Sequence, residues 1–180
     1  FVIQDMRVLN PKGDGVRVEG ADGVIFQRLH VEWDTEPDNL HGAYGIYPVQ
    51  TSNVLIDNCL VRGSSDAGIY VGQSEHIIVR RSRAFENVAG IEIENSYNAI
   101  VEDNDVYDNT GGILVFALKA PPRFKLAKDI VVRNNRITDN NTPPFVNASG
   151  LVLTIPPGTG VMVLASQNVD IYNNTITKHK

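Results

Sequence analysis

Gly68-Ile69-Tyr70-Val71 begins a sequence motif that this chain repeats about every 22 residues. The motif continues with Ile77 and Val79 in a second short segment, and with Ser82 and Ala84 in a third. The same opening returns elsewhere, at Gly45-Ile46-Tyr47, Gly90-Ile91-Glu92-Ile93, Gly112-Ile113-Leu114-Val115 and Gly160-Val161-Met162-Val163. A fixed period of this length is typical of a solenoid, in which each repeat buries its apolar face only against its neighbours.

Each repeat contains three short stretches in which apolar residues alternate, and this is the period of a strand. Stacking the repeats about 4.8 Å apart pairs each strand in parallel with the same strand of the next coil. The inward positions then form aliphatic columns, as an enclosed core requires. The columns are Ile46, Ile69, Ile91, Ile113 and Val161 for the first strand, Val54, Ile77, Ala99, Ile130 and Val169 for the second, and Val61, Ala84, Val106, Ile137 and Ile176 for the third.

A polar column is expected at the tight turn between the second and third strands. It consists of Asn104, Asn135 and Asn174, with Cys59 and Ser82 in earlier coils. Stacked Asn amides bond one another and the turn backbone. The glycine motif, the three-strand period and this column resemble the right-handed parallel β-helix family, which includes pectate lyases and mannuronan C-5-epimerases. The resemblance covers the whole chain and implies an all-β, right-handed parallel β-helix with three strands per coil of about 22 residues.

Residues 1–180 are expected to form one β-helix domain, because a repeat array has no internal boundary. Both ends of the chain lie in predicted strands of the repeat, and neither carries an evident cap. We therefore interpret the chain as a segment of a longer β-helix. Lys and Arg number 16 against 21 Asp and Glu, a formal net charge of −5 without a basic run, which argues against a nucleic-acid partner. The apolar stretches are too short to predict a membrane-spanning segment.

Three loops are much longer than the minimal turns of the repeat. They cover residues 32–44, 116–129 and 139–159. Loops of this length in an otherwise minimal repeat are usually functional or disordered. Because all three flank the first-strand face, the sequence predicts a groove there.

The outward column of the first strand is polar and aromatic. It contains Arg17, Tyr47, Tyr70, Glu92, Leu114 and Met162, with Glu19, Glu94 and Phe116 one step further along. A flat surface with tyrosines stacked one above the other suits a sugar ring. We therefore expect an extended polysaccharide to bind along this groove. The candidate substrate-binding residues are Tyr47, Tyr70, Glu94, Arg17 and Tyr44.

Acidic residues on this face are candidates for acid–base catalysis. Glu92 and Glu94 share one strand face, which places their Cβ atoms roughly 6.5–7 Å apart. Glycoside hydrolysis uses two carboxyl groups about 5–9.5 Å apart. Asp66 enters the same region from the preceding coil, and His41 reaches in from the loop. The predicted catalytic residues are Asp66, Glu92 and His41, although alternating Glu residues also occur on exposed strands with no catalytic role.

Lyase or epimerase chemistry on a uronate-containing glycan is the other enzymatic interpretation. It needs a cation or metal that neutralises the substrate carboxylate, together with a base such as His or Tyr. His41, Tyr44 and Arg17 supply such groups. However, the sequence has no Asp-Pro-His-Asp motif of the epimerases, no paired-Asp signature of polygalacturonases and no Arg-rich motif of pectate lyases. Whether the protein is an enzyme therefore stays open.

No metal site is assigned from the sequence, but Ca²⁺ is an alternative ligand of the acidic residues. Two sets of acids come into consideration. They are Asp34, Glu36 and Asp38 in one loop, and Asp66, Glu92 and Glu94 on the first-strand face. The loop set lacks the glycine and the terminal Glu of an EF-hand, which favours a solvated acidic loop.

A non-catalytic scaffold is the competing hypothesis. Its basis is an outward aliphatic stripe on the second strand, formed by Ile25, Leu55, Ile78, Ile100 and Val131. Such a stripe is too apolar to leave bare, so a missing segment, a partner or a second chain is expected to cover it. Residues 42–50 and 66–74 also resemble an exported bacterial β-helix family that is often encoded beside a dihaem c-type cytochrome. This resemblance implies a periplasmic or extracellular location, and the expected partner on the stripe is a c-type cytochrome or another protein.

Overall fold

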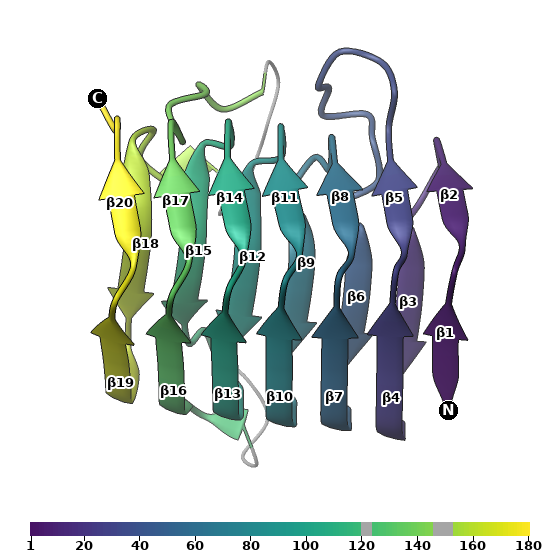
Figure 1. The fold of residues 1–180 in the computed structure, drawn as a ribbon, viewed down its shortest axis with the longest axis vertical. Helices are drawn as coiled ribbons and strands as arrows, with labels where there is room; N and C mark the ends of the chain where they lie inside the picture. Colours follow the sequence, from purple (N-terminus) through teal and green to yellow (C-terminus); the bar gives the residue numbers. More distant parts are fainter. Residues whose placement is uncertain (120–123, 146–152) are drawn as a thin grey trace.

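The chain forms a stack of coils in which all strands pair in parallel (Figure 1). The structure is a computed structural model and describes residues 1–119, 124–145 and 153–180. Each coil contributes one strand to each of three sheets, which run along the stack. We name them the first-, second- and third-strand sheets, in the order in which the repeat supplies their strands. The predicted all-β solenoid with three strands per coil is confirmed.

The strand bounds follow the repeat motif closely. The first-strand sheet contains β3 (Val16–Glu19), β6 (Ile46–Val49), β9 (Ala67–Gly72), β12 (Ala89–Glu94), β15 (Gly111–Phe116) and β18 (Thr159–Leu164). The second-strand sheet contains β1 (Val2–Gln4), β4 (Asp22–Gln27), β7 (Ser52–Asp57), β10 (Glu75–Arg80), β13 (Tyr97–Glu102), β16 (Ala127–Arg133) and β19 (Ser166–Tyr172). The third-strand sheet contains β2 (Arg7–Leu9), β5 (His30–Glu32), β8 (Leu60–Arg62), β11 (Arg83–Phe85), β14 (Asp105–Tyr107), β17 (Arg136–Thr138) and β20 (Thr175–Thr177).

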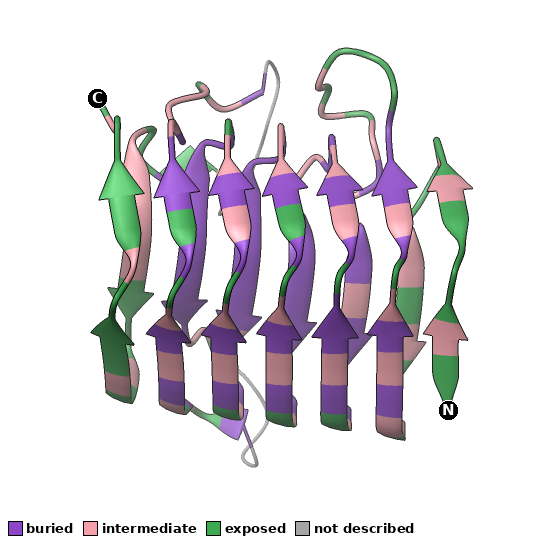
Figure 2. Ribbon diagram, in the orientation of Figure 1, coloured by how far each residue is buried: buried purple, intermediate pink, exposed green. Residues whose placement is uncertain are grey.

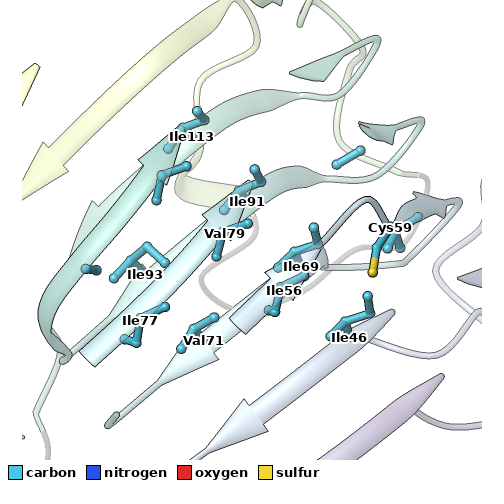
Figure 3. Close-up of a cluster of buried hydrophobic side chains, with 14 of the residues drawn as sticks. Ile46, Ile56, Cys59, Ile69, Val71, Ile77, Val79, Ile91, Ile93 and Ile113 are labelled. Carbon is cyan, nitrogen blue, oxygen red and sulfur yellow. The ribbon is translucent and has the colours of Figure 1, made fainter. Parts of the chain in front are cut away.

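The predicted inward columns form the core, except in the last coil, where Val161 and Val169 are partly buried and Ile176 is exposed. Ile69 pairs with Ile91, and Ile77 pairs with Ala99, so equivalent side chains stand one above the other. Figure 3 shows the isoleucines of successive coils pointing into this interior, with Cys59 among them. Burying a side chain of this size contributes about 1.5–3 kcal/mol. The core is therefore a continuous aliphatic cylinder, and Cys59 fills it as a small apolar residue.

The predicted polar column in the turn between the second and third strands is confirmed. The backbone N–H of Ser82 donates to Asn104 Oδ1 at 3.0 Å, and that of Asn104 donates to Asn135 Oδ1 at 3.0 Å. The series continues from Asn135 to Asn174 at 2.9 Å, while Cys59 N–H donates to the Ser82 hydroxyl at 3.1 Å. Each side chain thus satisfies a buried turn donor of the preceding coil.

Two further polar columns run along the stack that were not predicted from the sequence. One follows the third strand, where Ser64, Asn87, Asn109 and Asn140 are linked by side-chain to backbone hydrogen bonds from coil to coil. The other links Thr51, Ser74 and Ser96 after the first strand. With these columns, all three corners of the coil have internal partners for their turn backbone.

The turn between the second and third strands also has a fixed backbone conformation. One residue in each coil there adopts a left-handed conformation, with φ between 51° and 56°. These residues are Asp5, Arg28, Asn58, Arg81, Asp103, Asn134 and Asn173. Asn and Asp tolerate this region better than other residues with a side chain, so most coils follow the local preference.

Burial separates the middle of the first-strand sheet from the other two sheets (Figure 2). Along β10 and β13 the inward residues are buried and the outward ones are not. In contrast, β9 and β15 are buried at every position. The outward face of this sheet is therefore covered by other parts of the chain at β9 and β15, whereas β3 and β18 have no buried residue.

The three long loops lie where the sequence places them. They connect β5 to β6, β15 to β16 and β17 to β18, and Figure 1 shows the first and third at the same edge of the stack and the second at the opposite edge. Residues 120–123 and 146–152 of the predicted loops lie outside the described residues. Within the described part of the chain, no helix has the length and apolar character needed to cross a membrane.

Candidate functional site

The predicted outward column of the first strand is assembled in register. Arg17 pairs with Tyr47, and Glu92 pairs with Tyr70 on one side and Leu114 on the other. Leu114 in turn pairs with Met162. These residues therefore lie one above the other on one outward face, as expected.

This face is not the open aromatic platform that the sequence predicts. Tyr70 is only 5% exposed and Glu92 only 4%. The tyrosine packs in a small apolar cluster with Phe145 and Ile155, which belong to the loop between β17 and β18. Its ring also contacts Tyr44 at a centroid distance of 4.5 Å. The loops fold back over the sheet, so Tyr70 has no free ring face on which a sugar can stack.

What the loops leave open is a small pocket, which we call the acid pocket. Its volume is about 100 Å³. It is lined by Tyr44, Asp66, Glu92, Glu94, Leu114, Phe116, Leu118, Thr154, Ile155, Met162 and Leu164. All three long loops contribute to this lining. One wall therefore carries carboxyl and hydroxyl groups, and the rest is mostly apolar.

The carboxyl groups of the acid pocket hold their protons more tightly than usual. Burial raises the pKa of Asp66 to about 6, the hydroxyl of Tyr44 opposes this by donating a hydrogen bond, and the charge of Glu94 adds to it. Burial, together with the charges of Asp66 and Glu94, raises the pKa of Glu92 well above its ordinary value. Burial also raises the pKa of Glu94, although Tyr70 Oη donates to Glu94 Oε2 at 2.7 Å. Three interacting acids of this kind do not lose their protons independently of one another.

His41 does not join these acids, and its predicted reach into the site is corrected. Its Nδ1 lies 2.7 Å from the carbonyl oxygen of Gly63, and its Nε2 lies 2.9 Å from Thr35 Oγ1. The ring stacks on Trp33 with a centroid distance of 5.9 Å. One ring nitrogen is engaged within the loop and the other by Gly63 of the next coil, so His41 ties the loop to the stack.

Arg17 and Tyr47 lie at the rim of the site. The Arg17 guanidinium lies 4.9 Å from the Tyr47 ring centroid and forms an ion pair with Glu19 at 2.9 Å. Tyr47 meets Tyr70 edge to face at 5.0 Å and Tyr44 at 4.5 Å. The predicted substrate-binding residues are thus in one place, but Arg17 does not line the acid pocket.

Neither acid set considered for Ca²⁺ forms a metal-binding group. Among the described residues, no three His, Cys, Asp or Glu side chains are placed so that they could hold a metal ion. In the loop, Asp34 accepts a hydrogen bond from Asn10 and Asp38 accepts one from the backbone of Leu40, both at 2.8 Å. Asp34 is thus engaged by the preceding coil, and Asp38 by the backbone of its own loop.

The comparison with known families agrees with the geometry. The chain matches the family model described as "Right handed beta helix region" over residues 1–180. It belongs to this right-handed β-helix family. A comparison with curated proteins finds no match. Membership confirms the fold and its handedness, and it assigns no reaction to the acid pocket of this β-helix protein.

Gly72 is a site residue that the sequence analysis missed. A Cβ atom at this position would lie 2.4 Å from Tyr70 Oη and 2.6 Å from its Cζ. Because Gly72 has no side chain, the ring of Tyr70 can lie across it and reach Glu94 in the next coil. The signal in the sequence is a glycine at an outward position where neighbouring coils carry Val49 and Glu94.

Replacing Gly72 by Ala is expected to lower the free energy of unfolding by about 1–3 kcal/mol, because the new methyl group overpacks against the Tyr70 ring. Urea unfolding measures this change. Gly13→Ala is the matched control, since a Cβ at Gly13 meets nothing within 4 Å. Equal effects of the two substitutions would show that Tyr70 does not need the space above Gly72.

Proposed function

We propose that this β-helix protein binds a neutral saccharide in the acid pocket and cleaves its glycosidic bond by acid–base catalysis. The observation that carries the proposal is the confinement of Asp66, Glu92 and Glu94 in one pocket, where burial raises their pKa values. Glycoside hydrolysis needs one protonated and one ionised carboxyl group at the same pH. A buried group of three interacting carboxyls supplies both.

The burial of each acid suggests its role. Glu92 is the most deeply buried, so it keeps its proton longest and acts as the general acid that protonates the leaving oxygen. Asp66, with a pKa of about 6, is ionised above that pH and takes the proton of the attacking water. The water oxygen then bonds to the anomeric carbon as the glycosidic bond breaks. Tyr70 positions Glu94 through its hydrogen bond.

The charge of the pocket favours a neutral substrate over a uronate. Lyase and epimerase reactions need a cation beside the substrate carboxylate. Among the described residues that line the acid pocket, none is a Lys, Arg or His. A uronate would meet further carboxyl groups there, and Arg17 at the rim of the site is paired with Glu19. A periplasmic or extracellular location, where glycans are abundant, belongs to this proposal.

The test is a panel of neutral and uronate-containing oligosaccharides, with binding followed by calorimetry and cleavage by the release of reducing ends. We expect neutral glycans to bind more tightly. Glu92→Gln should lower the cleavage rate by about 100-fold or more, as expected for loss of a general acid, with binding changed only several-fold. Asp170→Asn is the control, because Asp170 is exposed and lies outside the pocket. Tighter binding of uronates, or no binding of any glycan, would refute the proposal.

A scaffold that docks a partner protein is the second candidate function. The aliphatic stripe is in register from Ile25 to Val131. Most of it lines a groove of about 540 Å³, with Asn53, His76 and Asn98 beside it. An apolar groove of this length suits a protein partner such as a c-type cytochrome. Titration with a purified c-type cytochrome measures this directly, and the absence of binding would remove this candidate.

A further inference from the structure

A second concave site lies where the second- and third-strand sheets meet, and we call it the arginine cleft. Its volume is about 330 Å³. It is lined by Arg28, Leu29, His30, Asn58, Cys59, Leu60, Arg81 and Arg83. None of these residues lines the acid pocket. The arginine cleft is therefore a separate site from the acid pocket.

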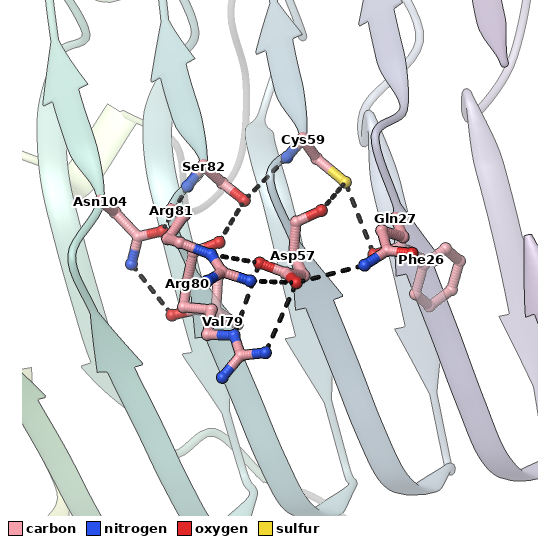
Figure 4. Close-up of polar contacts among 9 residues, drawn as sticks. All are labelled: Phe26, Gln27, Asp57, Cys59, Val79, Arg80, Arg81, Ser82 and Asn104. Carbon is pink, nitrogen blue, oxygen red and sulfur yellow. Dashed lines mark hydrogen bonds and ion pairs between the residues drawn. The ribbon is translucent and has the colours of Figure 1, made fainter. Parts of the chain in front are cut away.

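Two of the arginines are held in fixed orientations by carboxylates. Arg28 donates to Asp5 through Nε and Nη2, at 2.6 and 2.7 Å. Arg81 donates to Asp57 through the same two atoms, at 2.8 and 2.6 Å (Figure 4). A guanidinium has five N–H donors, and each of these pairs uses two of them. The remaining donors are left on a group that has already lost its rotational freedom, which lowers the entropic cost of binding.

Of the two carboxylates that bind these arginines, Asp57 is buried and Asp5 is exposed. Asp57 is 1% exposed and also accepts a hydrogen bond from Gln27 at 3.4 Å, while Arg80 Nε lies 3.4 Å from it. The hydrogen bonds from Arg81 lower the pKa of this buried carboxyl, so it remains charged. Figure 4 shows the arginines and Gln27 converging on it. Arg81 is thus held against a permanent buried charge.

The backbone at the cleft departs from the rule of the other coils. Arg28 and Arg81 occupy the left-handed position of their turns, with φ of 51° in both. Every other described coil has Asn or Asp at this position, as local preference requires. The two exceptions line the same cleft, one coil on either side of Asn58. Unfavourable residues at strained positions are characteristic of functional sites.

Arg83 adds a charge that no carboxylate neutralises among the described residues. Its side chain is exposed, and it stands beside Asp105 of the next coil. That carboxylate already pairs with Arg136 at 2.8 Å. At the other edge of the cleft, His30 Nε2 lies 3.0 Å from Glu32. Within the described structure, Arg83 therefore leaves an uncompensated positive charge at the cleft, on a chain whose formal net charge is −5.

We propose that the arginine cleft binds a single tetrahedral oxyanion, a sulfate or phosphate group, through Arg28, Arg81 and Arg83. Guanidinium groups form paired hydrogen bonds with such oxyanions. The exposed amide of Asn58 lies between the first two arginines and offers a further donor. The group is either a free anion or an ester carried by a sugar, because both present the same oxygens.

The experiment titrates the whole chain with inorganic sulfate and phosphate at constant ionic strength, with chloride as the balancing salt. Arg83→Gln should weaken binding about tenfold, as expected for the loss of charged hydrogen bonds. Arg83→Lys should lose part of the affinity, because lysine keeps the positive charge but lacks the paired N–H donors of the guanidinium group. Since Arg83 is exposed and unpaired in the described structure, the melting temperature should not change.

Lys125→Gln is the matched control, because Lys125 is exposed and lies outside the cleft. Unchanged affinity in Arg83→Gln, or an equal loss in both variants, would overturn the proposal and indicate general charge screening. A second series compares inorganic sulfate with a monosaccharide sulfate. Tighter binding of the sugar ester would identify an esterified glycan as the ligand, and the opposite result would identify a free anion.

Discussion

Replacing Asn109 by Leu is expected to lower the free energy of unfolding by about 3–5 kcal/mol. The side-chain amide of Asn109 donates to the carbonyl oxygens of Ala84 and Tyr107 and to Asn140 Oδ1, at 3.0, 2.9 and 2.8 Å. Its Oδ1 accepts hydrogen bonds from the backbone and the side chain of Asn87. Leucine has a similar volume but leaves these groups buried without partners, and each such group costs about 1–3 kcal/mol.

Urea unfolding measures the effect, and Gln167→Leu is the control. Gln167 carries an exposed amide on β19, so its replacement should change the free energy of unfolding by less than about 0.5 kcal/mol. Because each coil contacts only its neighbours, the loss at Asn109 should also weaken the cooperativity between the two halves of the stack. A loss below about 1 kcal/mol would mean that the polar column adds little to the stability of the native state.

The fold was predictable because the same inward positions recur in every coil. Alternation assigns Ile69 and Ile77 to the core, and the period stacks them on Ile91 and Ala99. The Asn87–Asn109 column was missed for a specific reason. Asn, Ser and Thr are also ordinary turn residues, so their presence after a strand does not reveal that they bond from coil to coil. Their recurrence at the repeat spacing was the available signal.

The candidate site was only partly predictable, because the loops that cover it are not part of the repeat. The register of Tyr70 and Glu92 follows from the period and is confirmed. Their burial depends on Phe145 and Ile155, which fold back from a non-periodic loop. The position of His41 is likewise decided by its contacts with Thr35 in its own loop and with Gly63 of the next coil. Periodicity thus predicts which residues share a face, while the loops decide which of them a ligand can reach.

The acid pocket should make the protein less stable as the pH rises. A carboxyl group with a raised pKa binds its proton more tightly in the folded state than in the unfolded chain. Its stabilising contribution is therefore complete below the unfolded pKa and is lost as the pH rises through the folded pKa. For Asp66 this window runs from 3.8 to about 6. The expected loss for this group is on the order of 2–3 kcal/mol.

Other carboxylates act in the opposite direction, so the total pH dependence does not isolate the pocket. Hydrogen bonds from Arg81 lower the pKa of Asp57, and one from Arg7 lowers that of Glu32. Their contributions are present above the unfolded pKa and are lost as the pH falls. The pocket is isolated by the difference between wild type and a variant that lacks its ionisable groups.

For the double variant Asp66→Asn/Glu92→Gln we compare the free energy of unfolding with that of wild type at pH 5 and at pH 8. The difference should shift by about 2 kcal/mol in favour of the variant as the pH rises, because its amides have no proton to lose. Urea unfolding at both pH values measures this gain, and Asp170→Asn should show none. A constant difference between variant and wild type would mean that the buried acids titrate normally. The same variant should lose glycan cleavage, since the charges that destabilise the fold are those proposed to catalyse the reaction. A substitution that increases stability while abolishing activity is characteristic of a functional site rather than a structural one.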